Sequence, residues 1–244
     1  GNTRKVRIFT PTREVPFAGH PNIGTAFVLA TIGAFGEVQD SLQVVFEEAA
    51  GLVPVRIEAM ESGRLWCELE APQDLKLGEI VGLELAASAL SLDPSDIATT
   101  VHPPRTAGVG LPFLIVELKN RDALGLARFN LAAMEALEQL GVPSDILLYT
   151  RESGDADIRA RMFAPLDGVP EDPATGSANC ALAALLSHCD PAESADFSFR
   201  IVQGVEMGRP SVLEARTNKR EGAVTATLIG GDCVMVSEGA LTVD

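Results

Sequence analysis

Residues 16–26 read PFAGHPNIGTA, and residues 171–186 read EDPATGSANCALAALL. Each stretch places a histidine or an aspartate, a proline and small residues in a turn, and an apolar segment follows directly. The apolar segments, residues 23–32 and 178–186, carry apolar side chains around most of a helix circumference, which is typical of a buried helix. The sequence therefore predicts two buried helices, each entered through a turn of small residues.

Short runs with partial alternation of apolar and polar residues surround these helices and predict half-buried strands. We expect strands at residues 6–10, 42–46, 53–59, 64–69, 113–118, 146–150, 158–163, 197–202, 212–217, 223–228 and 233–237. Segments 83–90 and 130–140 are expected to be covering helices. Many short strands around two buried helices indicate an α+β protein in which strands wrap around a central helix, twice over.

An internal repeat supports two domains. RIFTPTREVP, residues 7–16, aligns without gaps on RMFAPLDGVP, residues 161–170, and shares Arg, Phe, Pro, Val and Pro with it. In both copies the turn and the buried helix follow directly. Residues 93–104, rich in Pro, Ser and Thr, are the expected link, so we place an N-terminal domain at residues 1–102 and a C-terminal domain at residues 103–244.

Composition argues against several function classes. The formal net charge is -15, so a phosphate backbone is repelled and no nucleic-acid partner is expected. The most apolar stretch is shorter than the ~20 residues of a membrane-spanning helix, and we expect a soluble cytoplasmic protein. The four cysteines show neither the spacing of a disulfide framework nor that of a zinc site. We therefore expect buried, reduced thiols and disfavour a metal-dependent hydrolase. The cysteines are Cys67, Cys180, Cys189 and Cys233.

The two turns share a chemistry that suits small anions. The first turn of a helix exposes unpaired backbone N–H groups at the positive end of the helix dipole, and these attract carboxylates. Small residues leave the N–H groups accessible: Gly19 at the first turn, and Gly176, Ser177 and Ala178 at the second. We expect the second turn to bind a sulfate, phosphate or carboxylate.

His20 is the histidine that lies in such a turn. If the repeat places the two turns across one cleft, His20 and Asp172 stand beside the bound anion, where they can transfer or orient a proton. His102, beside Pro103, and His188, near the end of the second helix, are expected to be structural.

Four stretches resemble the phenazine-biosynthesis PhzF-like family, which is related in fold to diaminopimelate epimerase and proline racemase. They are RIFTPTREVPFAGHPNIGTA, GLPFLIVEL, RMFAPLDGVPEDPATGSANCALAALL and VQGVEMGRPS. The resemblance implies two diaminopimelate-epimerase-like domains, each a β-barrel-like sheet around a central helix, with the active site in the cleft between them. It also implies a homodimer.

The same resemblance implies a cofactor-independent isomerase or epimerase that abstracts and returns a proton on a small carboxylate-bearing substrate. His20 and Asp172 are then the polar groups of the active site, and Gly19, Gly176 and Ser177 line the substrate site. We expect no metal, nucleotide or flavin, because neither a dinucleotide fingerprint nor a phosphate loop is present.

The sequence departs from the related families in two ways. The racemases and epimerases carry a cysteine at each helix-entry turn as an acid/base pair, and neither turn has one here, so a two-thiol mechanism is not expected. PhzF-like chains carry a first strand and helix and an SET-like segment, whose glutamate transfers the proton, ahead of RIFTP. We expect that segment to be missing, with Glu14 as the candidate substitute.

These observations predict a PhzF-like isomerase, and an alternative of a different class stays open. The same scaffold can serve as a catalytically silent protein that binds a small anion or another molecule. Exchange of a substrate hydrogen in deuterated water separates the two, because a binding protein saturates without exchange.

Overall fold

The computed structural model describes residues 3–240 and 242. Thirteen strands of this part of the chain form one sheet, in the order β1-β4-β5-β6-β15-β14-β13-β11-β10-β9-β8-β7, with β12 paired to β11, and β2 and β3 form a separate pair. The strands are β1 (Arg4–Lys5), β2 (Ile8–Phe9), β3 (Glu14–Val15), β4 (Ser41–Glu48), β5 (Gly51–Ala59), β6 (Leu65–Glu70), β7 (Lys76–Ile80), β8 (Arg105–Gly108), β9 (Pro112–Glu117), β10 (Ile146–Thr150), β11 (Ile158–Ala164), β12 (Val169–Asp172), β13 (Ala195–Gln203), β14 (Ser211–Arg220) and β15 (Ala223–Asp232).

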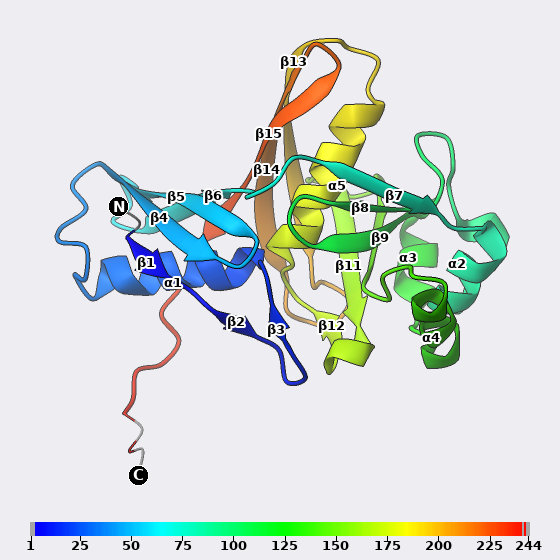
Figure 1. Ribbon diagram of the computed structural model, residues 1–244, viewed down its shortest axis with the longest axis horizontal. Helices are drawn as coiled ribbons and strands as arrows, with labels where there is room; N and C mark the ends of the chain where they lie inside the picture. The colour runs from blue at the N-terminus through cyan, green and yellow to red at the C-terminus, as the bar shows by residue number, and fades with distance from the viewer. Residues whose placement is uncertain (1–2, 241, 243–244) are drawn as a thin grey trace.

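The helices divide into two that the sheet encloses and three that cover its outer face. They are α1 (Gly19–Thr31), α2 (Leu83–Leu90), α3 (Arg121–Leu126), α4 (Leu131–Gln139) and α5 (Gly176–Cys189), with 3₁₀ turns at Pro94–Asp96 and Pro165–Asp167. Figure 1 shows α1 beside β4, β5 and β6, and α5 beside β13, β14 and β15, while α2, α3 and α4 gather at one end of the molecule.

One apolar core contains both enclosed helices, and its members include Ile23 and Ala26 of α1 and Leu182 of α5. A second core lies between the other face of β9–β11 and the covering helices α2–α4. The prediction of all-round burial is correct for α5, whose residues from Gly176 to Ser187 are all buried. It is wrong for α1, which buries one side and leaves Val28 39% exposed, because β5 and β6 cover only that side.

Three local predictions need correction. α1 begins at Gly19 rather than at residue 23, since Pro21 falls in the first helical turn, where its missing N–H costs no hydrogen bond. The strand expected at residues 233–237 does not form, because β15 ends at Asp232 and the described residues beyond it have no ladder partner. Sequence patterning also missed β7 and β8, which are short and contain few apolar residues.

Pairing of the sheet crosses the boundary placed between residues 102 and 103. β7 precedes that point and pairs antiparallel with β8, which follows it, while β15, near the C-terminal end, pairs with β6. The chain thus exchanges strands between its two halves, and the boundary itself stays a prediction. The expected link is packed rather than free, because Ile97 and His102 are buried.

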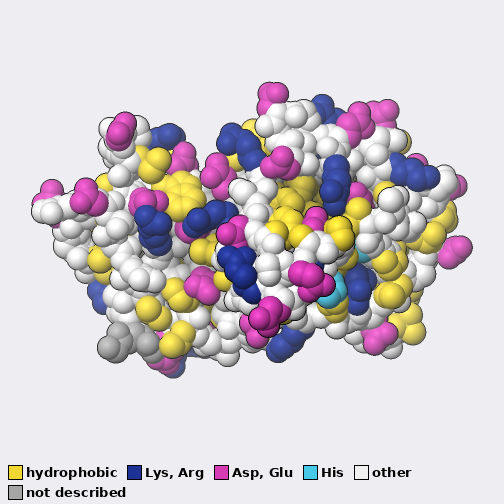
Figure 2. Space-filling view, turned by 90° about the horizontal axis from the view of Figure 1, so that it is seen from above, with side chains coloured by type: hydrophobic (Ala, Val, Ile, Leu, Met, Phe, Trp, Pro, Cys, Tyr) yellow, Lys and Arg dark blue, Asp and Glu magenta, His cyan; other side chains and the backbone are white. Residues whose placement is uncertain are grey.

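Charged side chains of both signs are interspersed on the face seen in Figure 2. Several form pairs, such as Arg64 Nη1 with Asp232 Oδ2 at 2.9 Å and Arg200 Nη1 with Glu214 Oε1 at 3.4 Å. Among the residues that the structure describes, no helix is long and apolar enough to cross a membrane.

Candidate active site

The first turns of α1 and α5 touch through their backbones. A side chain at Gly19 would place its Cβ 2.7 Å from the carbonyl carbon of Gly176 and 2.7 Å from the nitrogen of Ser177. A side chain at Gly176 would place its Cβ 2.8 Å from the Cα of Gly19. No real Cβ atom fits at such distances, so glycine is required at both positions and the two helix N-termini converge on one point.

His20 and Asp172 come from opposite copies of the repeat and lie side by side at this point. His20 is the second residue of α1, Asp172 ends β12, and His20 Nδ1 is 3.9 Å from Asp172 Oδ2. The His20 side chain is 57% exposed and that of Asp172 only 16%. The structure therefore pairs an accessible imidazole with a partly buried carboxylate.

A buried amide network holds the carboxylate side of this pair. Thr175 Oγ1 donates to Asp172 Oδ2 at 2.6 Å, and Gln203 Nε2 donates to both Thr175 Oγ1 and the Asp172 carbonyl oxygen, at 3.0 and 2.7 Å. Gln203 Oε1 accepts from the Thr175 nitrogen at 3.2 Å and from Asn179 Nδ2 at 2.7 Å. With all these contacts made inside the protein, the first turn of α5 and Asp172 are fixed together.

Sequence reasoning missed Gln203 and Asn179. One available signal was the repeat, because Asn22 and Asn179 are the fourth residues of α1 and α5. An asparagine at the same position of two otherwise apolar helices indicates a shared polar role.

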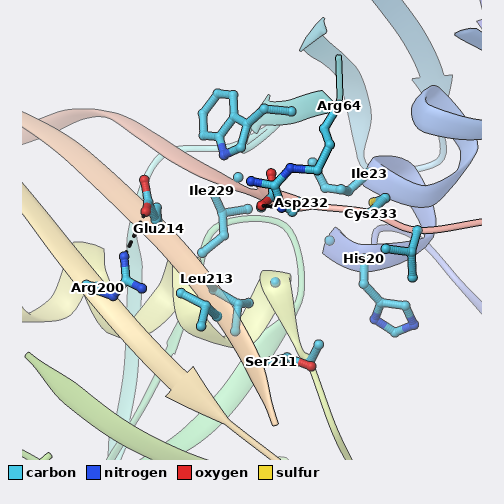
Figure 3. Close-up of a pocket in the computed structure, with 18 of the residues that line it drawn as sticks. His20, Ile23, Arg64, Arg200, Ser211, Leu213, Glu214, Ile229, Asp232 and Cys233 are labelled. Atoms are coloured by element: carbon cyan, nitrogen blue, oxygen red, sulfur yellow. Dashed lines mark hydrogen bonds and ion pairs between the residues drawn. The ribbon is translucent and has the colours of Figure 1, made fainter. Parts of the chain in front are cut away.

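Two adjoining cavities open beside the pair. One of about 530 Å³ is lined by His20 and Asp172, and one of about 780 Å³ is lined by Gly19, His20 and Gly176. Figure 3 shows His20 at one side of the larger cavity and the Arg200–Glu214 pair across from it. The cavity beside His20 is thus enclosed by elements from both halves of the chain.

The predicted site residues do not all face these cavities. Gly19 and Gly176 line the larger one, whereas Ser177 and Ala178 are buried in α5 and line neither. The binding role of all four residues stays a prediction. Glu14 lines a separate cavity of about 370 Å³ and pairs with Arg7 at 2.8 Å.

The other two histidines line neither cavity. His102 is buried, with Nε2 2.9 Å from the Tyr149 hydroxyl and Nδ1 2.8 Å from the Pro103 carbonyl oxygen. Burial lowers the pKa of His102 and favours its neutral form. His188 lies exposed near the end of α5.

Two cysteines belong to the segments that surround this site. Cys233 lines both cavities, and burial raises the pKa of its thiol. Cys180, inside α5, is fully buried, and burial raises its pKa as well. Within residues 3–240 and 242, no group of three or more His, Cys, Asp or Glu side chains is arranged to hold a metal ion.

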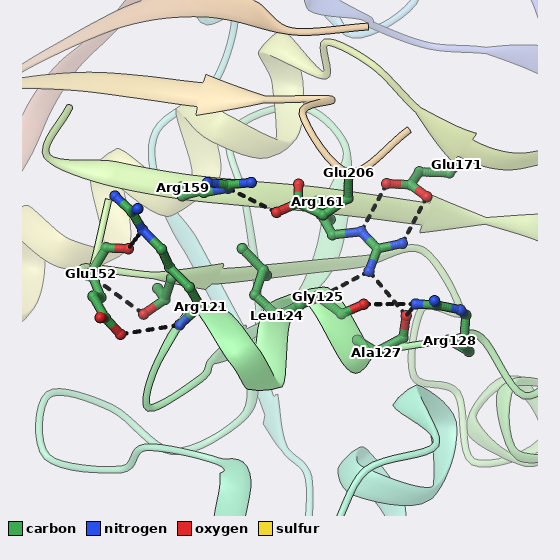
Figure 4. A network of polar contacts seen from close by, with 11 residues as sticks. Arg121, Leu124, Gly125, Ala127, Arg128, Glu152, Arg159, Arg161, Glu171 and Glu206 are labelled. Atoms are coloured by element: carbon green, nitrogen blue, oxygen red, sulfur yellow. Dashed lines mark hydrogen bonds and ion pairs between the residues drawn. The ribbon is translucent and has the colours of Figure 1, made fainter. Parts of the chain in front are cut away.

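A buried arginine anchors β12, the strand that carries Asp172. Arg161 donates from Nε to Glu171 Oε1 at 2.9 Å, and its Nη1 donates to the carbonyl oxygens of Leu124 and Ala127 at 2.8 and 3.0 Å (Figure 4). The Arg161 side chain is only 5% exposed. Its charge is therefore balanced by Glu171 and by the backbone of α3.

The first copy of the repeat contains a similar arginine–glutamate pair at the surface, although Glu14 aligns with Gly168 and not with Glu171. Arg7 Nε donates to Glu14 Oε1 at 2.9 Å, and the side chains are 61% and 40% exposed. Arg7 lies over the Phe9 ring at 4.8 Å, as Arg161 lies over Phe163 at 4.8 Å. The arginine and the phenylalanine beneath it are equivalent in the two copies, whereas the glutamate partner and the burial of the pair differ.

Comparison with known proteins agrees with this architecture. Residues 2–239 match the family described as phenazine biosynthesis-like protein. A trans-2,3-dihydro-3-hydroxyanthranilate isomerase of Pseudomonas chlororaphis is 31% identical over 239 residues, which cover 97% of this chain and 78% of the relative.

Two solved structures resemble the chain. A phenazine biosynthesis protein of the PhzF family from Bacillus anthracis superposes with a TM-score of 0.79 at 22% identity, covering 93% of this chain and 76% of that one. A Pseudomonas aeruginosa structure described as a predicted epimerase superposes with a TM-score of 0.76 at 27% identity, covering 98% and 79%. These findings confirm the predicted α+β fold class and the PhzF-like resemblance.

The two arginine pairs lead to a paired stability prediction. Arg161→Ala leaves the Glu171 carboxylate and two carbonyl groups without their donor in a buried setting, and such losses cost ~3–5 kcal/mol of unfolding free energy. Arg7→Ala is the matched control and should change stability little, because water replaces its contacts. Urea unfolding of both variants measures the difference, and equal losses would contradict the assignment.

The glycine contact predicts which helix positions tolerate alanine. Gly19→Ala and Gly176→Ala should each prevent the helix approach and abolish or strongly weaken folding and ligand binding. Gly24→Ala, in the same helix as Gly19, meets no atom within 4 Å and should stabilise the protein by ~0.5–1 kcal/mol through helix propensity. Thermal denaturation of the three variants provides the measurement. If the Gly19→Ala variant had the melting temperature of the wild type, the contact would not constrain the fold.

Proposed function

This chain belongs to the phenazine biosynthesis-like protein family, and from that premise we propose that it is an isomerase that moves a proton between two positions of a small carboxylate-bearing substrate. His20 and Asp172 are the side chains that we assign to the proton transfer. We assign the substrate carboxylate to the joined first turns of α1 and α5, beside Gly19 and Gly176.

The observation that carries the proposal is the meeting of two helix N-termini next to an imidazole and a carboxylate. Each N-terminus presents unpaired N–H groups and the positive end of a dipole. One exposed helix terminus stabilises a nearby anion by only ~0.3–1 kcal/mol. Here two termini act on the same place, because Gly19 and Gly176 are in contact. An anion bound there lies beside the His20–Asp172 pair, whose nearest atoms are 3.9 Å apart.

The proposed reaction changes neither the oxidation state nor the atoms of the substrate. A base removes a proton from a carbon activated by a neighbouring carbonyl or alkene, the electron pair moves along the conjugated bonds, and a proton is returned to another carbon. His20 is the group able to take and return this proton. Asp172, held by Thr175 and Gln203, is the carboxylate that we assign to orienting the imidazole.

The cavity and the family support a proposal for the substrate class. The Pseudomonas chlororaphis relative is named for trans-2,3-dihydro-3-hydroxyanthranilate, and we propose a small carboxylate of related type for this chain. The cavity of about 780 Å³ offers Met60 and Trp66 as apolar walls. Its cations, Arg64 and Arg200, are paired with Asp232 and Glu214 of the same lining. The homodimer implied by the resemblance stays a prediction.

Hydrogen exchange tests the assignment of His20. We expect the wild-type protein to incorporate deuterium into trans-2,3-dihydro-3-hydroxyanthranilate in deuterated water, as followed by proton NMR. His20→Asn removes the acid–base group and should slow the exchange by ~10²- to 10⁴-fold. His188→Asn, which changes an exposed histidine outside both cavities, is the control and should exchange at the wild-type rate.

Two outcomes would count against the proposal. Saturable binding of the probe by the wild type without any exchange would favour the catalytically silent binding protein. Exchange by His20→Asn at the wild-type rate would remove His20 from the proton transfer, even if the isomerase function held.

A further inference from the structure

The repeat provides counterparts for two members of the amide network around Asp172, Asn179 and Gln203. Asn22 Nδ2 donates to the Ala18 carbonyl oxygen at 2.9 Å, and Asn179 Nδ2 donates to the Thr175 carbonyl oxygen at the same distance. Both asparagines are the fourth residues of their helices, and both are fully buried. The two first turns are therefore built alike.

Glu48 occupies the place in the first copy that Gln203 has in the second. Glu48 is the last residue of β4, which pairs in parallel with β1 and antiparallel with β5. Gln203 is the last residue of β13, which pairs in parallel with β11 and antiparallel with β14. A carboxyl group thus stands where the other copy has an amide.

The two side chains differ in how their polar atoms are satisfied. Gln203 uses both its oxygen and its nitrogen in hydrogen bonds to the first turn of α5 and to Asp172. Glu48 is only 9% exposed, yet neither of its carboxyl oxygens has a hydrogen-bond partner among the described residues. Asn22 Oδ1 lacks a partner there as well, as does Asn179 Oδ1 in the second copy, so the two copies differ at Glu48 and Gln203. A buried carboxylate without partners is costly, whereas a protonated carboxyl group gains a donor that a carboxylate lacks.

The surroundings favour the protonated form. Burial raises the pKa of Glu48 to about 7, and the neighbouring Asn22 amide only partly opposes this rise. The cavity of about 370 Å³ next to Glu48 is also lined by Lys5 and Arg7, by Glu14 on β3 and by Glu47 on β4 itself, while α1 contributes the uncharged Asn22. Arg7 and Glu14 pair with each other at 2.8 Å, and among the described residues no cation is hydrogen-bonded to the Glu48 carboxyl group.

We propose that protonated Glu48 is the positioning residue that holds the first turn of α1, and with it His20, in the way that Gln203 holds the first turn of α5 and Asp172. A protonated carboxyl group offers one donor and one acceptor, as the Gln203 amide does. Loss of the proton leaves a buried charge that is relieved by movement toward the adjoining cavity, and Asn22 and the turn lose their support. The effect on turnover rests on the proposed function, and the effect on the turn does not.

The stability readout follows from the direction of the shift. The carboxyl group is protonated in the folded protein up to a higher pH than in the unfolded chain, whose glutamate titrates near 4.5. Stability from Glu48 is therefore complete below about pH 4.5 and is lost as the pH rises to about 7. Glu48→Gln keeps the donor and acceptor at every pH. The difference in melting temperature between this variant and the wild type should therefore grow in favour of the variant between pH 5 and pH 8.

Turnover supplies a second readout that a merely structural role would not move. At pH 8, one unit above the folded-state value, about one-tenth of the Glu48 carboxyl groups keep their proton, so kcat/KM of Glu48→Gln should exceed that of the wild type about tenfold. At pH 5.5 the two proteins should be equal. Glu48→Ala lacks both donor and acceptor and should be slow at both pH values, while Glu37→Gln, an exposed control, should follow the wild type throughout.

The two readouts separate failure of this inference from failure of the isomerase assignment. Suppose that the difference in melting temperature grows with pH as described, but neither the wild type nor any variant turns over trans-2,3-dihydro-3-hydroxyanthranilate. The Glu48 inference then stands and the isomerase assignment fails. If the wild type turns over the probe but Glu48→Gln follows its pH profile in both melting temperature and kcat/KM, the Glu48 inference is overturned. Wild-type turnover by Glu48→Ala at pH 5.5 would overturn it as well.

Discussion

The backbone contact between Gly19 and Gly176 is the constraint on which the rest of the structure depends. Each helix N-terminus carries a positive partial charge of ~0.5, so placing two of them in contact is unfavourable unless negative charge stands nearby. Asp172 provides it, and the apolar core around Ile23 and Leu182 holds the helices at this distance. The two N-termini repel each other when no negative charge is near, and for the same reason they attract an anion.

The two copies of the repeat build similar turns by partly different chemistry. The second copy uses Thr175 and Gln203 to fix Asp172, and it buries its arginine pair under α3. The first copy has Ala18 where the second has Thr175, and Glu48 where the second has Gln203. As a result the carboxylate side of the site is rigidly supported, whereas the histidine side is more exposed and depends on a group that can lose its proton.

Much of this could be predicted from the sequence because it depends on local pattern. The small-residue turns, the apolar runs of α1 and α5 and the repeat identified the residues that now lie together, His20 and Asp172. The exchange of β7 and β15 between the halves could not be predicted, because strand partners far apart in sequence leave no local signal. Gln203 was missed for the same reason, since its role arises only when the end of β13 reaches the first turn of α5.

The unlike groups at the two turns bear on the kind of isomerisation. Inversion at one carbon needs an acid and a base on opposite faces of the substrate, and related enzymes place a thiol at each turn for that purpose. Here Asp172 is committed to Thr175 and partly buried, whereas His20 is open to both cavities. On the proposed assignment, a single accessible group next to a fixed charge suits removal and return of a proton on one face, with the new position set by the substrate's own conjugated bonds. The proposed isomerase is then better suited to shifting a double bond than to inverting a stereocentre.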